Sequence, residues 1–373
     1  MLAVAALAGI VIGARLTFEV HRLLFQPHGA IDLLLYRELI RDWFAETPVY
    51  IPSRGAVHPP ATFLVLWPLF GWGTATIIRW WYAVTTGLVI GLFARLLLRE
   101  ARPANRMDRG LLAVLIVASY PAAITIGNGQ ITFHVLLAAL MGVLIQRRRT
   151  PDIRWEAPLS ALFLIALVKP HLTLPFFWTV AFTRGWARPA VLTGIGYLAA
   201  TGAAFAFHGA GLEGLQPLVA AWFHKSQAGA TMAGYGNLHI WLGGLGLGAW
   251  ILGASALAFA LHGLWAWRHR GADAWVQIGV AAIVARLWAY HRVYDDLLLV
   301  FPLIALYRMA RRDAPDRVAW ALFLLGAVTL AAPITPILEE ASWALVAVWL
   351  LQLGYLGWRA EGERRYRGRV SAS

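Results

Sequence analysis

The first residue whose type and position could support chemistry is Asp32, which follows a long apolar segment at residues 2–25. A carboxylate at that point could accept a proton from an attacking hydroxyl group. Asp is also a common helix N-cap, and Asp32 stands at the start of residues 31–44, which alternate apolar and charged positions at helical spacing. The two roles are compatible, so the sequence leaves both open.

Several cations lie where an anionic ligand could bind. Lys169 stands inside an apolar run, where an ammonium group needs either an anion such as a lipid phosphate or a structural carboxylate. His291 and Arg292 belong to a polar turn at 290–296 and could hold a phosphate, the arginine in bidentate fashion. Arg292 could instead pair internally with Asp295, which lies three residues further on. The sequence does not choose between these alternatives.

Uncharged and locally paired polar groups complete the set of candidates. Asn128, Gln130 and Asn237 lie at predicted helix ends, where an amide can bond a sugar hydroxyl or cap the helix. Inside the first apolar segment, Arg15, Glu19 and Arg22 are spaced by four and then three residues. That spacing predicts ion pairs along one face of a helix.

The composition indicates what must position these residues. The chain has 373 residues, of which 60% are hydrophobic and 14% are charged, whereas soluble domains carry roughly a quarter charged residues. A membrane-spanning helix needs about 20 apolar residues, and the apolar runs predict an all-α membrane protein of about 10–12 spans in a single domain, 1–373. The 19 tryptophans are typical of membrane interfaces, and the absence of cysteine excludes thiol chemistry and disulfides.

The arginines predict the orientation of this bundle. Six short basic clusters between the apolar runs contain 22 of the 32 Lys and Arg residues. Cytoplasmic loops carry such an excess, so we place these clusters and both termini inside, in a cytoplasmic (inner) membrane. A net charge of +13 would raise the question of nucleic acid in a soluble protein, but here the charge lies between spans, and we expect no nucleic-acid partner.

If every basic cluster lies inside, the chain must cross the membrane an even number of times between one cluster and the next. This requirement assigns roles to the irregular segments. Residues 59–73 are too short to span comfortably and contain Pro68, so we expect an interfacial or re-entrant helix. Residues 157–183 must enter and return, with two half-length helices meeting near Lys169. The loops 26–58 and 208–239 then lie outside, and each is predicted to contain an interfacial amphipathic helix.

At this stage the polar motifs resemble a known group of enzymes. In chain order they are Asp32 with Tyr36, His58-Pro59-Pro60, Gly129-Gln130, Val168-Lys169-Pro170-His171, Gly236-Asn237-Leu238, and His291-Arg292-Val293-Tyr294-Asp295. Their order and spacing resemble the GT-C membrane glycosyltransferases, and most closely glycosyltransferase family 87, the polyprenyl-phosphate-mannose-dependent mannosyltransferases. The resemblance covers residues 1–310.

The resemblance implies a function and assigns roles. The donor would be a sugar on polyprenyl phosphate, the acceptor a glycolipid or glycan in contact with membrane lipids, and the reaction would invert the anomeric centre at the outer face. Asp32 would be the general base, with Lys169, His291 and Arg292 around the leaving phosphate. The residues that remain for sugar or acceptor binding are Tyr36, His58, Asn128, Gln130, His171 and Asn237.

Two other functions compete with this one. A lipid or polyprenyl-linked glycan transporter would usually show paired broken helices in two related halves, and only residues 157–183 have this pattern. A non-catalytic scaffold would leave six ordered polar motifs unexplained. The sequence has no nucleotide-binding or metalloprotease motif, so an activated substrate would arrive as a lipid, and we expect no cofactor. Metal dependence stays open, because the acids Asp295 and Asp296 are predicted to lie at the outer face.

Overall fold

The structure is a computed structural model, and it describes residues 2–149, 152–183, 186–209, 211–232, 234–311, 316–331 and 338–370. Every secondary-structure element in these ranges is a helix. In chain order they are α1 (Leu2–Phe25), α2 (Ile31–Phe44), α3 (Pro60–Phe70), α4 (Ala75–Ala101), α5 (Arg106–Val117), α6 (Tyr120–Asn128), α7 (Thr132–Arg148), α8 (Ile153–Ala166), α9 (Pro170–Ala181), α10 (Ala187–Phe207), α11 (Gly211–Met232), α12 (Leu238–Gly244), the short 3-10 helix η1 (Gly248–Trp250), α13 (Ile251–Arg268), α14 (Ala274–Trp288), the 3-10 helix η2 (Val293–Leu299), α15 (Val300–Ala310), α16 (Arg317–Ala331) and α17 (Leu338–Val370).

Three of these segments are long and apolar enough to cross a membrane, namely α4, α10 and Gly248–Arg268. The pair α5 and α6, which is bent by 40° at its break, would make a fourth. Large apolar side chains on them face outward, and Leu88 and Leu198 are each more than 70% exposed. Soluble proteins rarely leave such extended apolar surface uncovered, so lipid is its natural solvent. The prediction of an all-α chain is confirmed for the described residues, which include helices long and apolar enough to span a membrane, while the predicted number of spans stays a prediction.

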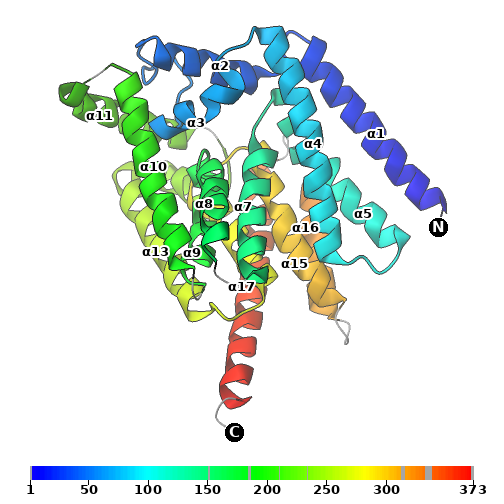
Figure 1. The fold of residues 1–373 in the computed structure, drawn as a ribbon. Coiled ribbons are helices and arrows are strands. Elements are labelled where there is room, and N and C mark those ends of the chain that lie inside the picture. Colours follow the sequence, from blue (N-terminus) through cyan, green and yellow to red (C-terminus); the bar gives the residue numbers. More distant parts are fainter. Residues whose placement is uncertain are drawn as a thin grey trace.

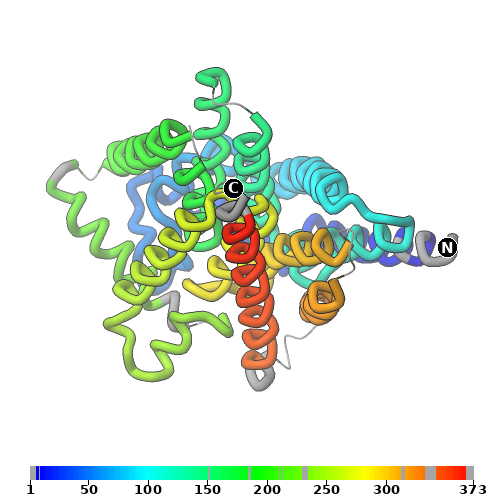
Figure 2. Tube along the Cα trace, turned by 90° about the horizontal axis from the view of Figure 1, so that it is seen from below, coloured from blue at the N-terminus to red at the C-terminus, as the bar shows by residue number. Residues whose placement is uncertain are grey.

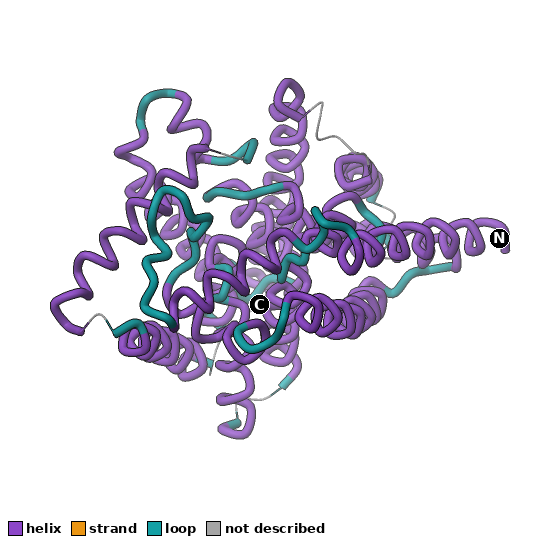
Figure 3. Tube along the Cα trace, turned by 90° about the horizontal axis from the view of Figure 1, so that it is seen from above, coloured by secondary structure: helices purple, strands orange, loops and turns teal. Residues whose placement is uncertain are grey.

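The bundle has two distinct ends. The helices α2, α3 and α11 lie toward one end, and α17 projects from the opposite end (Figure 1). Viewed from the α17 end, the C-terminus lies near the middle and the start of α1 lies at the edge (Figure 2). The view onto the α2 end shows only helix and loop in the described residues (Figure 3).

The predicted broken helix is a hairpin whose tip is Lys169. The Lys169 ammonium contacts the side chain of Gln130, just before α7. At the far end of α7, Gln146 donates to the Val180 carbonyl of α9 at 2.8 Å. Helix α9 therefore runs in the same direction as α7, and α8 must run the opposite way to reach Lys169. Pro170 is the first residue of α9. A backbone N–H at that position would have no acceptor within the helix, so a proline there leaves no hydrogen-bond donor unsatisfied.

The centre of the bundle holds the tip of this hairpin. Nearly every residue of α14 and α15 is buried, in contrast to the outward-facing α4, α10 and α13. The 3-10 helix η2 joins α14 to α15 and packs beside α6 and α7. This arrangement brings the polar turn at 290–296 to the level of Lys169.

Candidate active site

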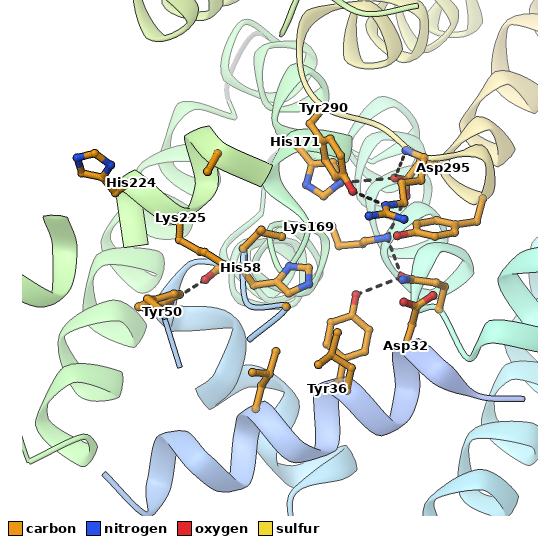
Figure 4. A pocket seen from close by; sticks show the side chains of 18 of the residues that line it. Asp32, Tyr36, Tyr50, His58, Lys169, His171, His224, Lys225, Tyr290 and Asp295 are labelled. Carbon is orange, nitrogen blue, oxygen red and sulfur yellow. Dashed lines mark hydrogen bonds and ion pairs between the residues drawn. The ribbon is translucent and has the colours of Figure 1, made fainter. Parts of the chain in front are cut away.

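A cavity of about 640 Å³ opens at the α2 end of the bundle. Its wall is formed by α2, the loop at 50–58, the Lys169 tip, α11 and the polar turn at 290–296 (Figure 4). Seven of the predicted site residues line it: Asp32, Tyr36, His58, Gln130, Lys169, His171 and Arg292. A cavity of this size with convergent polar groups is the usual form of a small-molecule site.

Asp32 is fixed by a tight contact between α2 and the end of α6. The N-cap of α2 is Ala30, whose backbone is left-handed (φ 57°) and whose N–H donates to the Gly127 carbonyl at 2.8 Å. Asp32 is thus the second residue of α2, so the predicted N-cap role for Asp32 is wrong. Gly129 is also left-handed (φ 73°), and a Cβ there would lie 2.4 Å from the Cβ of Leu33. Glycine at 129 lets α2 approach closely enough to bring Asp32 to the cavity.

Arg79 holds the turn that precedes α2. Its guanidinium donates to the carbonyls of Leu24 and Gln26, both at 3.2 Å, and to that of Gly29 at 3.1 Å. Leu24 lies in the last turn of α1 and Gly29 follows its end, so the arginine satisfies two carbonyls that have no helical partner, while the Gln26 carbonyl also accepts from the backbone N–H of Gly29. Arg79 therefore contributes to the position of Asp32 without touching the cavity.

The electrostatic surroundings of Asp32 suit a base. Burial raises the pKa of this carboxyl group, against the opposing effects of Gln130, Lys169 and Arg292. Its Oδ2 atom is buried and has no hydrogen-bond partner among the described residues. A carboxylate with a raised pKa and a free oxygen can accept a proton from a ligand hydroxyl more readily than an ordinary aspartate.

Lys169 is paired with a carboxylate in the structure. Its ammonium lies 2.9 Å from Oδ1 of Asp295 and also donates to Gln130 (2.9 Å) and Thr132 (3.1 Å). Both members of the ion pair are at most 2% exposed. An ammonium group has three N–H donors, and here the protein accepts all three. Of the two alternatives left open by the sequence, the structural carboxylate fits this geometry, and the predicted phosphate role of Lys169 does not.

Asp295 is the acidic centre of this network. Burial alone would raise its pKa, but Lys169 and His171 outweigh that effect and hold the pKa well below its usual range. Its second oxygen accepts from the backbone N–H of Arg292 at 3.2 Å. The predicted pair between the Arg292 and Asp295 side chains is therefore wrong, because the guanidinium donates instead to the Tyr290 hydroxyl.

Arg292 is an available cation at this side of the cavity. Its guanidinium is exposed, lies over the Tyr290 ring and has no carboxylate within ion-pair distance among the described residues. It is close enough to Asp32 for each charge to affect the pKa of the other. A free guanidinium beside a basic carboxylate can bind an oxyanion such as a phosphate.

Three further predicted residues line the cavity as uncharged or weakly basic groups. Tyr36 donates to Gln130 at 3.1 Å, and its ring centroid lies 5.0 Å from that of His58. Burial lowers the pKa of His58 to about 3, so this imidazole is neutral at physiological pH. His171 approaches Asp295 to 3.8 Å. These groups can donate and accept hydrogen bonds at the same time, which suits sugar hydroxyls.

Three predicted site residues do not line the cavity. Asn128 accepts from Arg22 of α1, and Asn237 is fully buried and caps α12 by accepting from the backbone N–H of Ile240 at 3.1 Å. His291 is also fully buried, and burial holds its pKa well below the usual value, so it supplies no positive charge for a phosphate. The structure therefore does not bring these three residues to the cavity wall, and for Asn237 it shows the helix cap that the sequence had left open.

Sequence reasoning missed two charged residues of the cavity wall: Asp295, which was named only as a possible partner of Arg292, and Lys225 on α11. An amphipathic helix was predicted within the loop 208–239, but Lys225 was not singled out in it. The signal that could have identified it is the use of lysine, because the chain contains 30 arginines and only two lysines. Both lysines, Lys169 and Lys225, line this cavity.

Within the ranges that the structure describes, no group of three or more His, Asp and Glu side chains is arranged to hold a metal ion. No protein-family model matches the chain, no curated protein is similar to it, and no solved structure matches its fold.

Proposed function

We propose that this chain is an inverting glycosyltransferase that moves a hexose from a polyprenyl-phosphate donor to a hydroxyl group of a glycolipid or glycan acceptor. The observation that carries the proposal is the juxtaposition of a carboxylate with a raised pKa, Asp32, and an unpaired guanidinium, Arg292, in one cavity. A base for the attacking hydroxyl and a cation for the departing phosphate are the two groups that this reaction needs.

In the proposed reaction the acceptor oxygen attacks the anomeric carbon and a new C–O bond forms. The bond between that carbon and the phosphate oxygen breaks, and the polyprenyl phosphate leaves with the electron pair. Asp32 takes the proton of the attacking hydroxyl, and Arg292 stabilises the charge that grows on the phosphate. Lys169 acts indirectly, because its pair with Asp295 fixes the polar turn that carries Arg292.

The proposed setting is a cytoplasmic membrane, with the cavity at the outer face. The hydrophobic composition and the outward-facing apolar helices support a lipid environment. The arginine-rich connection from α4 to α5 and the basic end of α17 lie at the end of the bundle away from α2 and α11 (Figure 1). A predominance of basic residues on the cytoplasmic side would then put the cavity outside and the arginine-rich ends inside.

The test uses Asp32→Asn in purified protein, with undecaprenyl-phosphate mannose as the donor probe and a membrane lipid extract as the source of acceptor. We expect the loss of nearly all sugar transfer, on the order of 10²–10⁴-fold for a lost general base. The matched control is Asp42→Asn, an aspartate on the same helix that pairs with Arg54 outside the cavity wall. Wild-type turnover by Asp32→Asn would remove the carboxylate from the mechanism, and consumption of no polyprenyl-phosphate sugar by the wild type would favour a transporter.

A further inference from the structure

The cavity contains more positive charge than the proposed donor requires. Lys169 is neutralised by Asp295, and Arg292 is the cation assigned to the donor phosphate. Lys225 then remains on the wall with no carboxylate within ion-pair distance among the described residues. Lys225 is half-buried and its ammonium lies at an exposed position of the wall, where an anionic group on a ligand can reach it.

Lys225 lies on a different side of the cavity from the proposed donor-phosphate site. It comes from α11 and faces the region of Tyr50 and His58, whereas Tyr290 and Asp295 lie across the cavity (Figure 4). Arg292 bonds Tyr290 and so belongs to that far side. One phosphate held at Arg292 would therefore leave Lys225 for a second anion.

The position of Lys225 is set by contacts between α11 and the loop at 50–58. Its ammonium donates to the Pro52 carbonyl at 3.0 Å. Ser226 and Trp222 both donate to the Val57 carbonyl, at 3.2 and 3.4 Å. These bonds attach α11 to the loop and use only one of the three donors of the ammonium group, so the others are available to a ligand in the cavity.

The choice of residue supports a functional reason for this charge. The chain uses arginine at 30 of its 32 Lys and Arg positions, and its two lysines both lie on this cavity. Lys169 has a specific reason, because a compact ammonium fits between three acceptors in a buried pocket. Lys225 shares the cavity and the residue type, and a compact point charge suits a phosphate or carboxylate that approaches from one direction.

We propose that the acceptor carries an anionic group, a phosphate or a carboxylate, which Lys225 binds while Asp32 faces the attacking hydroxyl. This inference rests on the proposed function, because a bound molecule is an acceptor only if the protein transfers a sugar to it. It goes beyond that function by giving the acceptor a chemical class: an acidic glycolipid or glycan, as opposed to a neutral one.

The test measures binding without turnover, in protein purified in a neutral detergent. Three probes share a dodecyl chain and a glucose ring: dodecyl glucoside, its 6-phosphate and dodecyl glucuronide. We expect wild-type protein to bind at least one anionic probe about tenfold more tightly than the neutral one, equivalent to about 1.4 kcal/mol. The phosphate and the glucuronide distinguish the two possible anions.

Three variants show which residue causes the preference for the anionic probe. Lys225→Gln should abolish the preference for the anionic probe and leave the affinity for undecaprenyl phosphate unchanged. Arg292→Gln should do the reverse, weakening undecaprenyl phosphate and leaving the anionic preference intact, and Lys225→Arg should restore most of the preference. Thermal unfolding of each variant checks the fold.

The outcomes separate this inference from the proposed function. Equal affinity of the wild type for all three probes, including no detectable binding of any, overturns the inference, as does a Lys225→Gln variant that loses undecaprenyl phosphate instead. A Lys225-dependent preference for an anionic probe in a protein that transfers no sugar would sustain the anion site and refute the glycosyltransferase.

Discussion

The pair formed by Lys169 and Asp295 gives a quantitative prediction. The two charges are 2.9 Å apart and at most 2% exposed. At an effective dielectric constant of about 20, unit charges at this distance attract one another by roughly 6 kcal/mol. Lys169→Met removes one charge and leaves the carboxylate buried without a counterion. We expect this substitution to destabilise the protein by about 3–5 kcal/mol, the usual cost of breaking a buried pair from one side.

The double variant Lys169→Met/Asp295→Asn distinguishes a pair from two independent effects. It leaves no buried charge, so it should be more stable than Lys169→Met alone, because replacement of a whole buried pair is often close to neutral. Arg364→Gln is the matched control, since Arg364 and Glu361 form an exposed pair at 2.7 Å on α17, and its loss should leave the unfolding temperature close to that of the wild type.

The assay is thermal unfolding in detergent, followed by intrinsic tryptophan fluorescence, with the affinity for undecaprenyl phosphate measured on the same samples. If the Lys169–Asp295 pair is structural, Lys169→Met lowers the unfolding temperature by several degrees and the double variant regains part of the loss. An unchanged unfolding temperature with a large loss of undecaprenyl phosphate binding would refute the structural role and return Lys169 to the phosphate site.

Two other predictions concern the pH dependence and a second buried cation. Burial raises the pKa of Asp32 above its ordinary value of 3.8, so the proposed activity should decline as pH falls and this carboxylate becomes protonated. Measurements of kcat/KM from pH 4 to 8 should show this decline, and a flat profile down to pH 4 would contradict the prediction. The Arg286 side chain is fully buried, and its guanidinium lies 4.6 Å from the ring centroid of Tyr235 and 4.5 Å from that of Trp349, so Arg286→Lys should lower stability by roughly 1–3 kcal/mol in thermal unfolding. Arg188→Lys, at a side chain that is 78% exposed, should change it by less than about 0.5 kcal/mol, and equal effects would remove the role of the stacked guanidinium.

Local features of the fold could be predicted from the sequence because neighbours along the chain determine them. The amphipathic spacing at 31–44 predicted α2 with the bounds that it has in the structure. Lys169 followed by Pro170 marked the tip of the α8–α9 hairpin, since proline begins a helix more readily than it continues one. The spacing of charges in α1 predicted that Glu19 would pair with its neighbours, and it lies 3.7 Å from Arg15 and 3.2 Å from Arg22.

Pairings across the fold could not be predicted in this way. Lys169 and Asp295 are 126 residues apart, and no periodicity relates them. The i,i+3 rule suggested Arg292 as the partner of Asp295, but that rule holds for side chains on an α-helix, and this segment begins a 3-10 helix in which Asp295 caps the backbone of Arg292. Asn237 was ambiguous for a similar reason, because an asparagine at a helix start can cap it or bind a ligand, and only its burial decides.

The two adjacent acids of η2 explain why the polar turn supplies a cation. Consecutive residues in a helix point in different directions, so Asp295 reaches Lys169 while Asp296 reaches Arg286 on α14. Each acid is thereby used by a buried cation from another part of the chain, and η2 is held from two sides. Arg292, at the start of the same segment, is left without a carboxylate partner and stays exposed in the cavity. The turn contains two acids and one arginine, yet it presents positive charge to a ligand. For this reason we expect a phosphate, and not a cation, to bind beside Asp32.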